Sequence, residues 1–328
     1  MAKVDFKHPK TWVAATLLLL LALVPVYVMW AGQSYYLTLF ARIMIYALAA
    51  LSLNFILGFG GLASLGHALY LGIGAYGVSI LQFHGFTNGW VQLGASLFAG
   101  LLFAAAVGSV VVRLTGMTFI MITLAFAQMG YFLAVTLKQY GGEDGRSIDT
   151  RSAMGIVDLS NNTTLYFTIF ACLIFALWLF SWLVDSRFGM VLRGCKSNER
   201  RMLALGFPTY RYKLAAYVIS ALVCVVAGFL LANLTLYVSP SYMQWTVSAD
   251  LIIMVVLGGM STLFGPVVGA VTFLVLEEVL SSFKPGLFPG VERLINDHWL
   301  AVVGTFVIVV VLTAKQGIYG WVASRSAR

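Results

Sequence analysis

The chain has 328 residues, of which 61% are hydrophobic and only 10% are charged. Together with a mean hydropathy of +0.93, this composition excludes a soluble domain of this length. The net charge of +8 comes from lysines and arginines on loops and tails, which indicates membrane orientation rather than nucleic-acid binding. Three scattered cysteines are too few for a disulfide framework or a metal site. The composition therefore predicts an all-α polytopic membrane protein.

The first apolar run, Trp12 to Trp30, follows Lys3, Lys7 and Lys10, as in a signal peptide. The run is longer than the apolar part of a signal peptide, however, and it lacks a clear A-x-A cleavage site. We therefore expect an uncleaved first span that starts in the cytoplasm.

Apolar runs long enough to cross a bilayer, which needs about 20 residues, alternate with charged stretches. The expected spans are 12–30, 36–57, 66–83, 90–112, 117–137, 164–184, 214–236, 249–263, 266–283 and 298–314. This predicts about ten transmembrane helices in a single transmembrane domain, residues 1–328, with both termini in the cytoplasm. The same count places segment 185–213 in the cytoplasm. Segment 138–163, which carries Glu143 and Asp144, then lies outside.

Segment 185–213 holds seven basic residues against two acidic ones. We expect a short helix in it, because Ser197 can cap its start, Glu199 lies near its positive end and Gly206 can end it. The apolar side of this helix comprises Met202, Leu203 and Leu205, and its solvated side Arg200 and Arg201. Two interpretations are open: the helix docks onto a cytoplasmic partner, or the segment only fixes orientation by its positive charge.

Two glycine-rich segments interrupt apolar runs, one in each half of the chain. The segment from Gly60 to His67 resembles the segment from Gly258 to Pro266, with one residue inserted. Paired interruptions indicate a translocation path, because unwound backbone is tolerated in a membrane only beside a cavity or inside protein. The pattern predicts an inverted repeat; chance similarity among helices that pack through small residues is the alternative. The expected hinge residues are Gly60, Gly61, Gly258, Gly259, Gly265 and Pro266.

Four polar residues beside these breaks are candidates for the substrate path: Asn54, Ser64, His67 and Thr262. Their side chains lie where the backbone can bend away from lipid. For His67, a hydrogen-bonded packing role is the alternative.

Catalytic and nucleotide-binding motifs are not found in the sequence. Residues 189–197 imitate a phosphate-binding loop, but Cys195 stands between the glycine and the lysine. The histidines are far apart in sequence, and none has a metal-ligand spacing. We therefore expect a chain that is not an enzyme and holds no metal and no nucleotide.

Charged residues inside the expected spans lie within about two helical turns of a span end, close enough to reach water. They are Arg42, Asp250, Glu277 and Glu278, with Arg113 at one cytoplasmic edge. None has the position of a midplane proton relay. This pattern suits a neutral or zwitterionic cargo and an external source of energy.

Three blocks of sequence carry the motifs of one known family. The run N-E-R-R-M-L-A-L-G-F at 198–207 and the run G-G-M-S-T-L-F-G-P-V-V-G-A at 258–270 resemble the permease subunits of branched-chain amino acid ABC importers. In the latter, Ser261 replaces a usual glycine. An early block, L-S-L-N at 51–54 followed by the glycines up to His67, looks like the LivM-type member of the permease pair. The resemblance covers residues 40 to 320.

This resemblance implies a permease subunit of an ATP-binding-cassette importer for branched-chain or related amino acids in the bacterial inner membrane. Its implied partners are a second permease, two cytoplasmic ATPases and a periplasmic binding protein. ATP would then be bound by the partner subunits, with no cofactor in this chain. The helix from Ser197 to Leu205 would be the coupling helix on an ATPase, and Glu143 and Asp144 could contact the binding protein.

Alternatives remain for the identity of the cargo and for the source of energy. The external G-G-x-x-G at 141–145 continues into polar residues unlike the family, and relatives of the family also import urea, short amides and aromatic acids. A different class, an ion-coupled secondary carrier or a channel, is the competing hypothesis. It would be expected to show a midplane carboxylate and no docking helix.

Overall fold

The computed structural model describes residues 16–25, 28, 34–155, 159–281, 299–313 and 317–320. Within them, five helices are long and apolar enough to cross a membrane. These are α2 (Ser34–Asn54) continued by the π-helical turn η1 (Phe55–Phe59), α4 (Gly89–Val111), α5 (Met117–Thr136), α6 (Asn162–Asp185) and α8 (Thr209–Thr235). Shorter helices are Thr16–Pro25, α3 (His67–Phe83), α9 (Trp245–Gly258), α10 (Gly265–Ser281) and α12 (Trp299–Thr313). The all-α polytopic class is confirmed. The expected spans 12–30, 266–283 and 298–314 lie partly outside the described residues.

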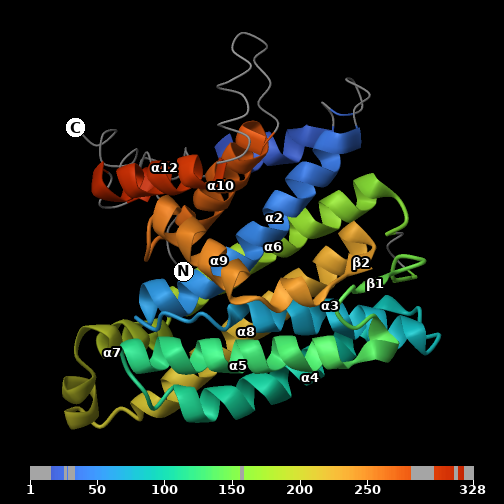
Figure 1. The fold of residues 1–328 in the computed structure, drawn as a ribbon. Coiled ribbons are helices and arrows are strands. Elements are labelled where there is room, and N and C mark those ends of the chain that lie inside the picture. Colours follow the sequence, from blue (N-terminus) through green and yellow to red (C-terminus); the bar gives the residue numbers. More distant parts are fainter. Residues whose placement is uncertain are drawn as a thin grey trace.

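The bundle is built around α2 and α8. In their most apolar windows, 83% and 61% of the residues are buried, against 22–33% in α4, α5 and α6. Figure 1 shows α2 and α8 inside the bundle, with α4 and α5 along one side. The outer helices expose large apolar side chains such as Phe98, Phe132 and Trp178. This is the pattern of a membrane protein, since lipid solvates such side chains.

Small residues allow the inner helices to approach closely. A Cβ atom on Gly228 of α8 would lie 1.9 Å from the carbonyl oxygen of Leu71 on α3. One on Gly74 of α3 would lie 2.1 Å from the carbonyl oxygen of Val225. Glycine at these positions therefore lets α3 and α8 pack backbone to backbone, as membrane helices commonly do.

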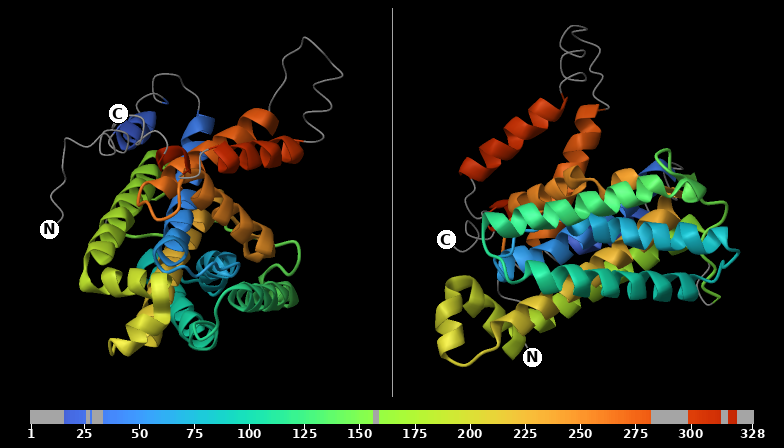
Figure 2. Two further views of the ribbon diagram at one scale, coloured as in Figure 1. Left: turned by 90° about the vertical axis from the view of Figure 1, so that its left-hand side faces the viewer. Right: turned by 60° about the horizontal axis from the view of Figure 1, so that its bottom comes forward.

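The two ends of the bundle differ in structure. The helix α7 (Arg187–Ala204) lies at one end, and the short strands β1 (Arg146–Ser147) and β2 (Tyr237–Val238) lie at the other (Figures 1 and 2). The 3-10 turn η2 (Lys138–Tyr140) precedes β1, and η3 (Pro240–Met243) packs against α3 and α5. β1 and β2 pair antiparallel, with Arg146 opposite Val238. Residues 187–204 and 138–155 therefore lie at opposite ends of the bundle axis.

Segment 185–213 is more helical than the sequence predicts. Where one short helix was expected, α7 begins at Arg187, and Val191, Leu192 and Cys195 in its first half are buried. At Asn198 the helix breaks, with φ −159° and ψ 99°. A second helical stretch follows and carries the predicted docking residues.

The predicted cap of this second stretch is wrong by one residue. The side-chain oxygen of Asn198, not that of Ser197, accepts a hydrogen bond from the backbone N–H of Arg201 at 3.0 Å. Both residue types are strong N-caps, and the extended backbone falls on Asn198. The predicted end is confirmed, because Gly206 has φ +84°. The N–H groups of Gly206 and Phe207 bond the carbonyls of Leu203 and Met202, which closes the helix.

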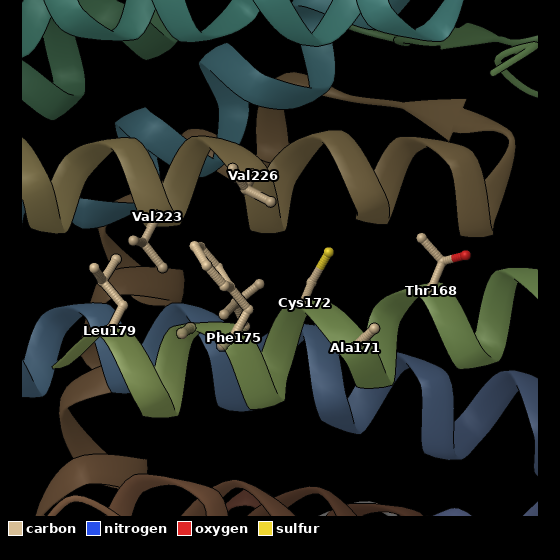
Figure 3. Close-up of a pocket in the computed structure, with 9 residues that line it drawn as sticks. Thr168, Ala171, Cys172, Phe175, Leu179, Val223 and Val226 are labelled. Carbon is tan, nitrogen blue, oxygen red and sulfur yellow. The ribbon is translucent and has the colours of Figure 1, made fainter. Parts of the chain in front are cut away.

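An apolar groove of about 340 Å³ separates α6 from α8 (Figure 3). Cys172 and Phe175 point from α6 toward Val223 and Val226 on α8. Thr168 is the polar side chain among the lining residues, and its hydroxyl donates to the carbonyl of Thr164. The groove is therefore lined almost entirely by apolar side chains.

Candidate functional site

Both glycine-rich segments break their helices as predicted. The first break follows the π-helical turn η1 and runs to the start of α3 at His67; the second separates α9 from α10. In each break the second glycine of the pair has a positive φ, +71° at Gly61 and +119° at Gly259. Residues with a side chain rarely adopt such backbone angles, so glycine permits the break.

Each of the two breaks also contains an equivalent hydrogen bond from a backbone N–H to a side-chain hydroxyl. The Ser64 hydroxyl accepts from the N–H of Gly66 at 3.1 Å, and the Thr262 hydroxyl accepts from the N–H of Gly265 at 3.1 Å. Each bond satisfies a backbone donor where the next helix starts. The spacing is two residues in the first break and three in the second, which matches the single inserted residue. The sequence similarity between the breaks therefore corresponds to a similar local structure.

Asn54, the last residue of α2, joins the helix that leads into the first break to the second break, more than 200 residues away. Its side-chain amide donates to the carbonyl of Thr262 at 2.8 Å, and its carbonyl oxygen accepts from the N–H of Ser261 at 3.2 Å. The side chain is fully buried. A Cβ atom on Gly58 would lie 2.3 Å from the Asn54 side-chain oxygen and 2.7 Å from the Ser261 nitrogen. The absence of a side chain at Gly58 lets the segments meet.

Lys196 of α7 also contacts the place where Gly58 and Ser261 meet, which we call the junction. Its ammonium donates to the carbonyl of Gly58 at 2.6 Å and to the Ser261 hydroxyl at 3.2 Å. The Ser261 hydroxyl donates to the same carbonyl at 2.6 Å. The lysine stem covers Gly61, where a Cβ atom would lie 2.9 Å from Lys196 Cγ. One residue of α7 thus contacts both breaks, a contact that sequence reasoning missed.

Ser261 has φ +64°, a conformation that favours glycine. This explains why the resembled family usually has glycine at this position. The serine hydroxyl compensates here by its bond to Gly58. The departure from the family motif was the one sequence signal that pointed to this residue.

His67 lies in a closed polar cluster between α2, α3 and α8. Its Nε2 is 2.9 Å from the hydroxyl of Ser220, which donates to the carbonyl of Ser52. That network assigns the ring proton to Nε2 and leaves Nδ1 as an acceptor with no hydrogen-bond partner in the described structure. The rings of Tyr70 and Tyr217 pack edge-on at 6.0 and 6.2 Å. In this conformation His67 has the packing role foreseen as its alternative.

The four candidate path residues differ in their exposure to solvent. Asn54, Ser64 and His67 are fully buried, whereas Thr262 is partly exposed. A path along the first three residues requires the breaks to move from the conformation described here.

The second stretch of α7 presents apolar side chains to the surroundings. Leu203 is 54% exposed, Leu205 65% and Phe207 38%. Arg200 and Arg201 are also exposed, while Met202 is partly covered. Phe207 was not among the predicted residues. Apolar residues gathered beside basic ones at a helix tip are typical of a protein-binding surface.

This docking tip, residues 199–207, is braced on α8. The Glu199 carboxylate lies 2.6 Å from the ammonium of Lys213 and accepts from the Thr209 hydroxyl at 3.2 Å. Lys213 is buried, although its place in a basic loop suggested a solvated residue. This ion pair, buried on the Lys213 side and partly exposed on the Glu199 side, together with the hydrogen bond to Thr209, ties the tip to the transmembrane helix.

Glu143 and Asp144 lie at the opposite end of the bundle, and both are exposed. Gly141, Gly142 and Gly145 turn the chain with positive φ. The Tyr237 hydroxyl on β2 donates to the backbone carbonyl of Asp144. The two carboxylates therefore stand on a braced turn at the surface.

Comparison with known proteins identifies the family. A family model described as branched-chain amino acid transport system / permease component matches residues 35–314. The chain belongs to this family. The high-affinity branched-chain amino acid transport system permease protein LivM of Salmonella typhimurium strain LT2 is 26% identical over 302 residues, 84% of this chain and 68% of its own length. The LivM protein of Escherichia coli strain K12 gives the same values. No solved structure matches.

The family match confirms the resemblance stated from the sequence, and it contains both breaks, α7 and the docking tip. The chain is therefore a multi-pass membrane permease component. The junction of Asn54, Gly58, Lys196 and Ser261 is the place where its breaks and its α7 helix meet.

Proposed function

We propose that this chain is one permease subunit of an ATP-binding-cassette importer for branched-chain or related amino acids in the bacterial inner membrane. The observation that carries the proposal is the pair of hydrogen bonds from Lys196 on α7 to Gly58, in the η1 turn that leads into the first break, and to Ser261 in the second break. Because the same helix ends in an exposed apolar tip, a partner that moves the tip would also move Lys196.

The proposed partners follow from this arrangement and from the family. The docking tip would fit into a groove on one of two cytoplasmic ATPases, which bind the ATP, so that this chain needs neither a cofactor nor catalysis of its own. A second permease would complete the path. A periplasmic binding protein would deliver the cargo on the side of Glu143 and Asp144. Both termini then lie in the cytoplasm.

In the proposed cycle, a displacement of α7 weakens the bonds of Lys196 to Gly58 and Ser261. The breaks then separate, and the buried side chains of Asn54, Ser64 and His67 become accessible to the path. Unwound backbone at Gly61 and Gly259 allows this without loss of helical hydrogen bonds.

Reconstitution tests the proposed function. The chain is placed in proteoliposomes with and without its second permease, the ATPases, ATP and the binding protein, and the uptake of labelled leucine is measured. We expect uptake only with the complete set. Uptake by the chain alone, driven by a proton or sodium gradient, would show an ion-coupled carrier instead. ATP-driven uptake of urea, short amides or aromatic acids but not leucine would keep the architecture and change the cargo.

A further inference from the structure

A small polar cavity lies between α2 and α10, apart from the junction of the breaks. It has a volume of about 190 Å³ and is lined by Leu39, Arg42 and Ile43 of α2 and by Leu274, Glu277 and Glu278 of α10. Each helix contributes residues at positions i, i+3 and i+4, which lie on one helix face. Two helices thus present one basic and two acidic side chains, with three aliphatic ones, to a common space.

The opposite charges that line this cavity do not form an ion pair with each other. Among the described residues, no ion pair joins Arg42 to Glu277. The Arg42 guanidinium lies 5.7 Å from the centre of the Tyr46 ring, and Glu278 accepts from the Tyr35 hydroxyl. Arg42 and Glu277 therefore face the same space with their charges not joined to each other.

A ligand that carries both charges would satisfy both groups at once. A carboxylate matches the planar fork of a guanidinium, and an ammonium matches a carboxylate. Arg42 is exposed, whereas Glu277 is half-buried. The Glu277 carboxylate therefore gains most from such pairing, since an uncompensated charge is costly away from water. A divalent cation fits less well, because Arg42 repels it and the oxygen ligands are few.

The walls and the size restrict the ligand further. Leu39, Ile43 and Leu274 form the apolar part of the lining, which suits an aliphatic side chain. The volume holds about six water molecules at roughly 30 Å³ each. It is below the roughly 300 Å³ at which pockets for drug-sized ligands begin. The cavity thus fits a small metabolite rather than a peptide.

We propose that this cavity binds a small zwitterionic amino acid, with its carboxylate on Arg42, its ammonium on Glu277 and its aliphatic side chain against Leu39, Ile43 and Leu274. The proposal rests on the proposed function, whose cargo it narrows to zwitterions. Arg42 precedes η1 by 13 residues, which is about 20 Å along a helix. The cavity would therefore be a binding site on the substrate path that is separate from the two breaks.

Equilibrium binding of labelled L-leucine tests the site in the complete transporter, held in lipid nanodiscs without the binding protein. Leucinol, which lacks the carboxylate, and 4-methylpentanoate, which lacks the ammonium, serve as competitors. For the wild type we expect each competitor to bind about tenfold or more weakly than leucine. Arg42→Gln should weaken leucine about tenfold and leave leucinol unchanged. Glu277→Gln should weaken leucine similarly and leave 4-methylpentanoate unchanged.

Arg113→Gln and Asp149→Asn are the matched controls, because both residues are exposed and outside the cavity lining. They should leave leucine binding unchanged. Unchanged leucine binding in both cavity variants, or wild-type competitors that equal leucine, would overturn the site. If ATP-driven leucine uptake persists in that case, only the site is wrong. If the complete wild-type transporter shows no ATP-driven uptake, the proposed function itself fails.

Discussion

At the scale of single residues, the junction depends on a missing side chain. Gly58 leaves room for the Asn54 amide and for the backbone of Ser261, both of which would lie within 2.7 Å of an added Cβ atom. Its carbonyl also accepts the bonds of Lys196 and Ser261. One glycine thus supports the contacts between the two breaks and α7.

Gly58→Ala should destabilise the protein, because the methyl group forces Asn54 and Ser261 apart. Overpacking of this kind costs about 1–3 kcal/mol, and the midpoint of thermal unfolding in detergent should fall. Gly94→Ala is the matched control, since a Cβ atom there meets nothing within 4 Å. It should leave the midpoint unchanged or raise it slightly. Equal midpoints for the two variants would contradict the close approach at Gly58.

At the scale of elements, α7 combines a first half that buries one face with an exposed tip. Its tip is held by Glu199, Lys213 and the cap of Asn198. Replacing Leu203 or Leu205 with Asp should leave insertion and folding intact, since both side chains are exposed. It should abolish binding of the ATPases, because an apolar groove would reject the carboxylate. Copurification of the ATPases with each variant measures this; retention of the ATPases by both would contradict the docking role.

The sequence predicted much of the element structure and little of its tertiary contacts. Long apolar runs and the pairs Gly60–Gly61 and Gly258–Gly259 predicted the helices and their breaks, because both signals are local. The choice of Asn198 over Ser197 as cap was not predictable, since neighbouring residues of equal capping strength compete. Lys196 was missed because its contact with Gly58 spans 138 residues. Lys213 was assigned to water, although Glu199 allows its burial.

At the scale of the whole molecule, the family, the breaks and α7 combine into one account. The docking tip lies at one end of the bundle, and Lys196 connects the same helix to both breaks. The Arg42 cavity lies farther along α2. Energy supplied at the tip could therefore reach the breaks through a single side chain, while the cargo is held elsewhere along the path.

The coupling of ATP hydrolysis to transport in Lys196→Met tests this account most directly. Methionine keeps an apolar stem against Gly61 and removes the ammonium that binds Gly58 and Ser261. Arg187→Met, an exposed position on the same helix, is the control. Leucine uptake and ATP hydrolysis are measured together in proteoliposomes that contain the complete transporter. We predict continued hydrolysis with leucine uptake per ATP reduced about tenfold for Lys196→Met, since bonds to a charged group contribute about 1.5–3 kcal/mol, and no change for Arg187→Met. An unchanged ratio of leucine to ATP in Lys196→Met would contradict the account.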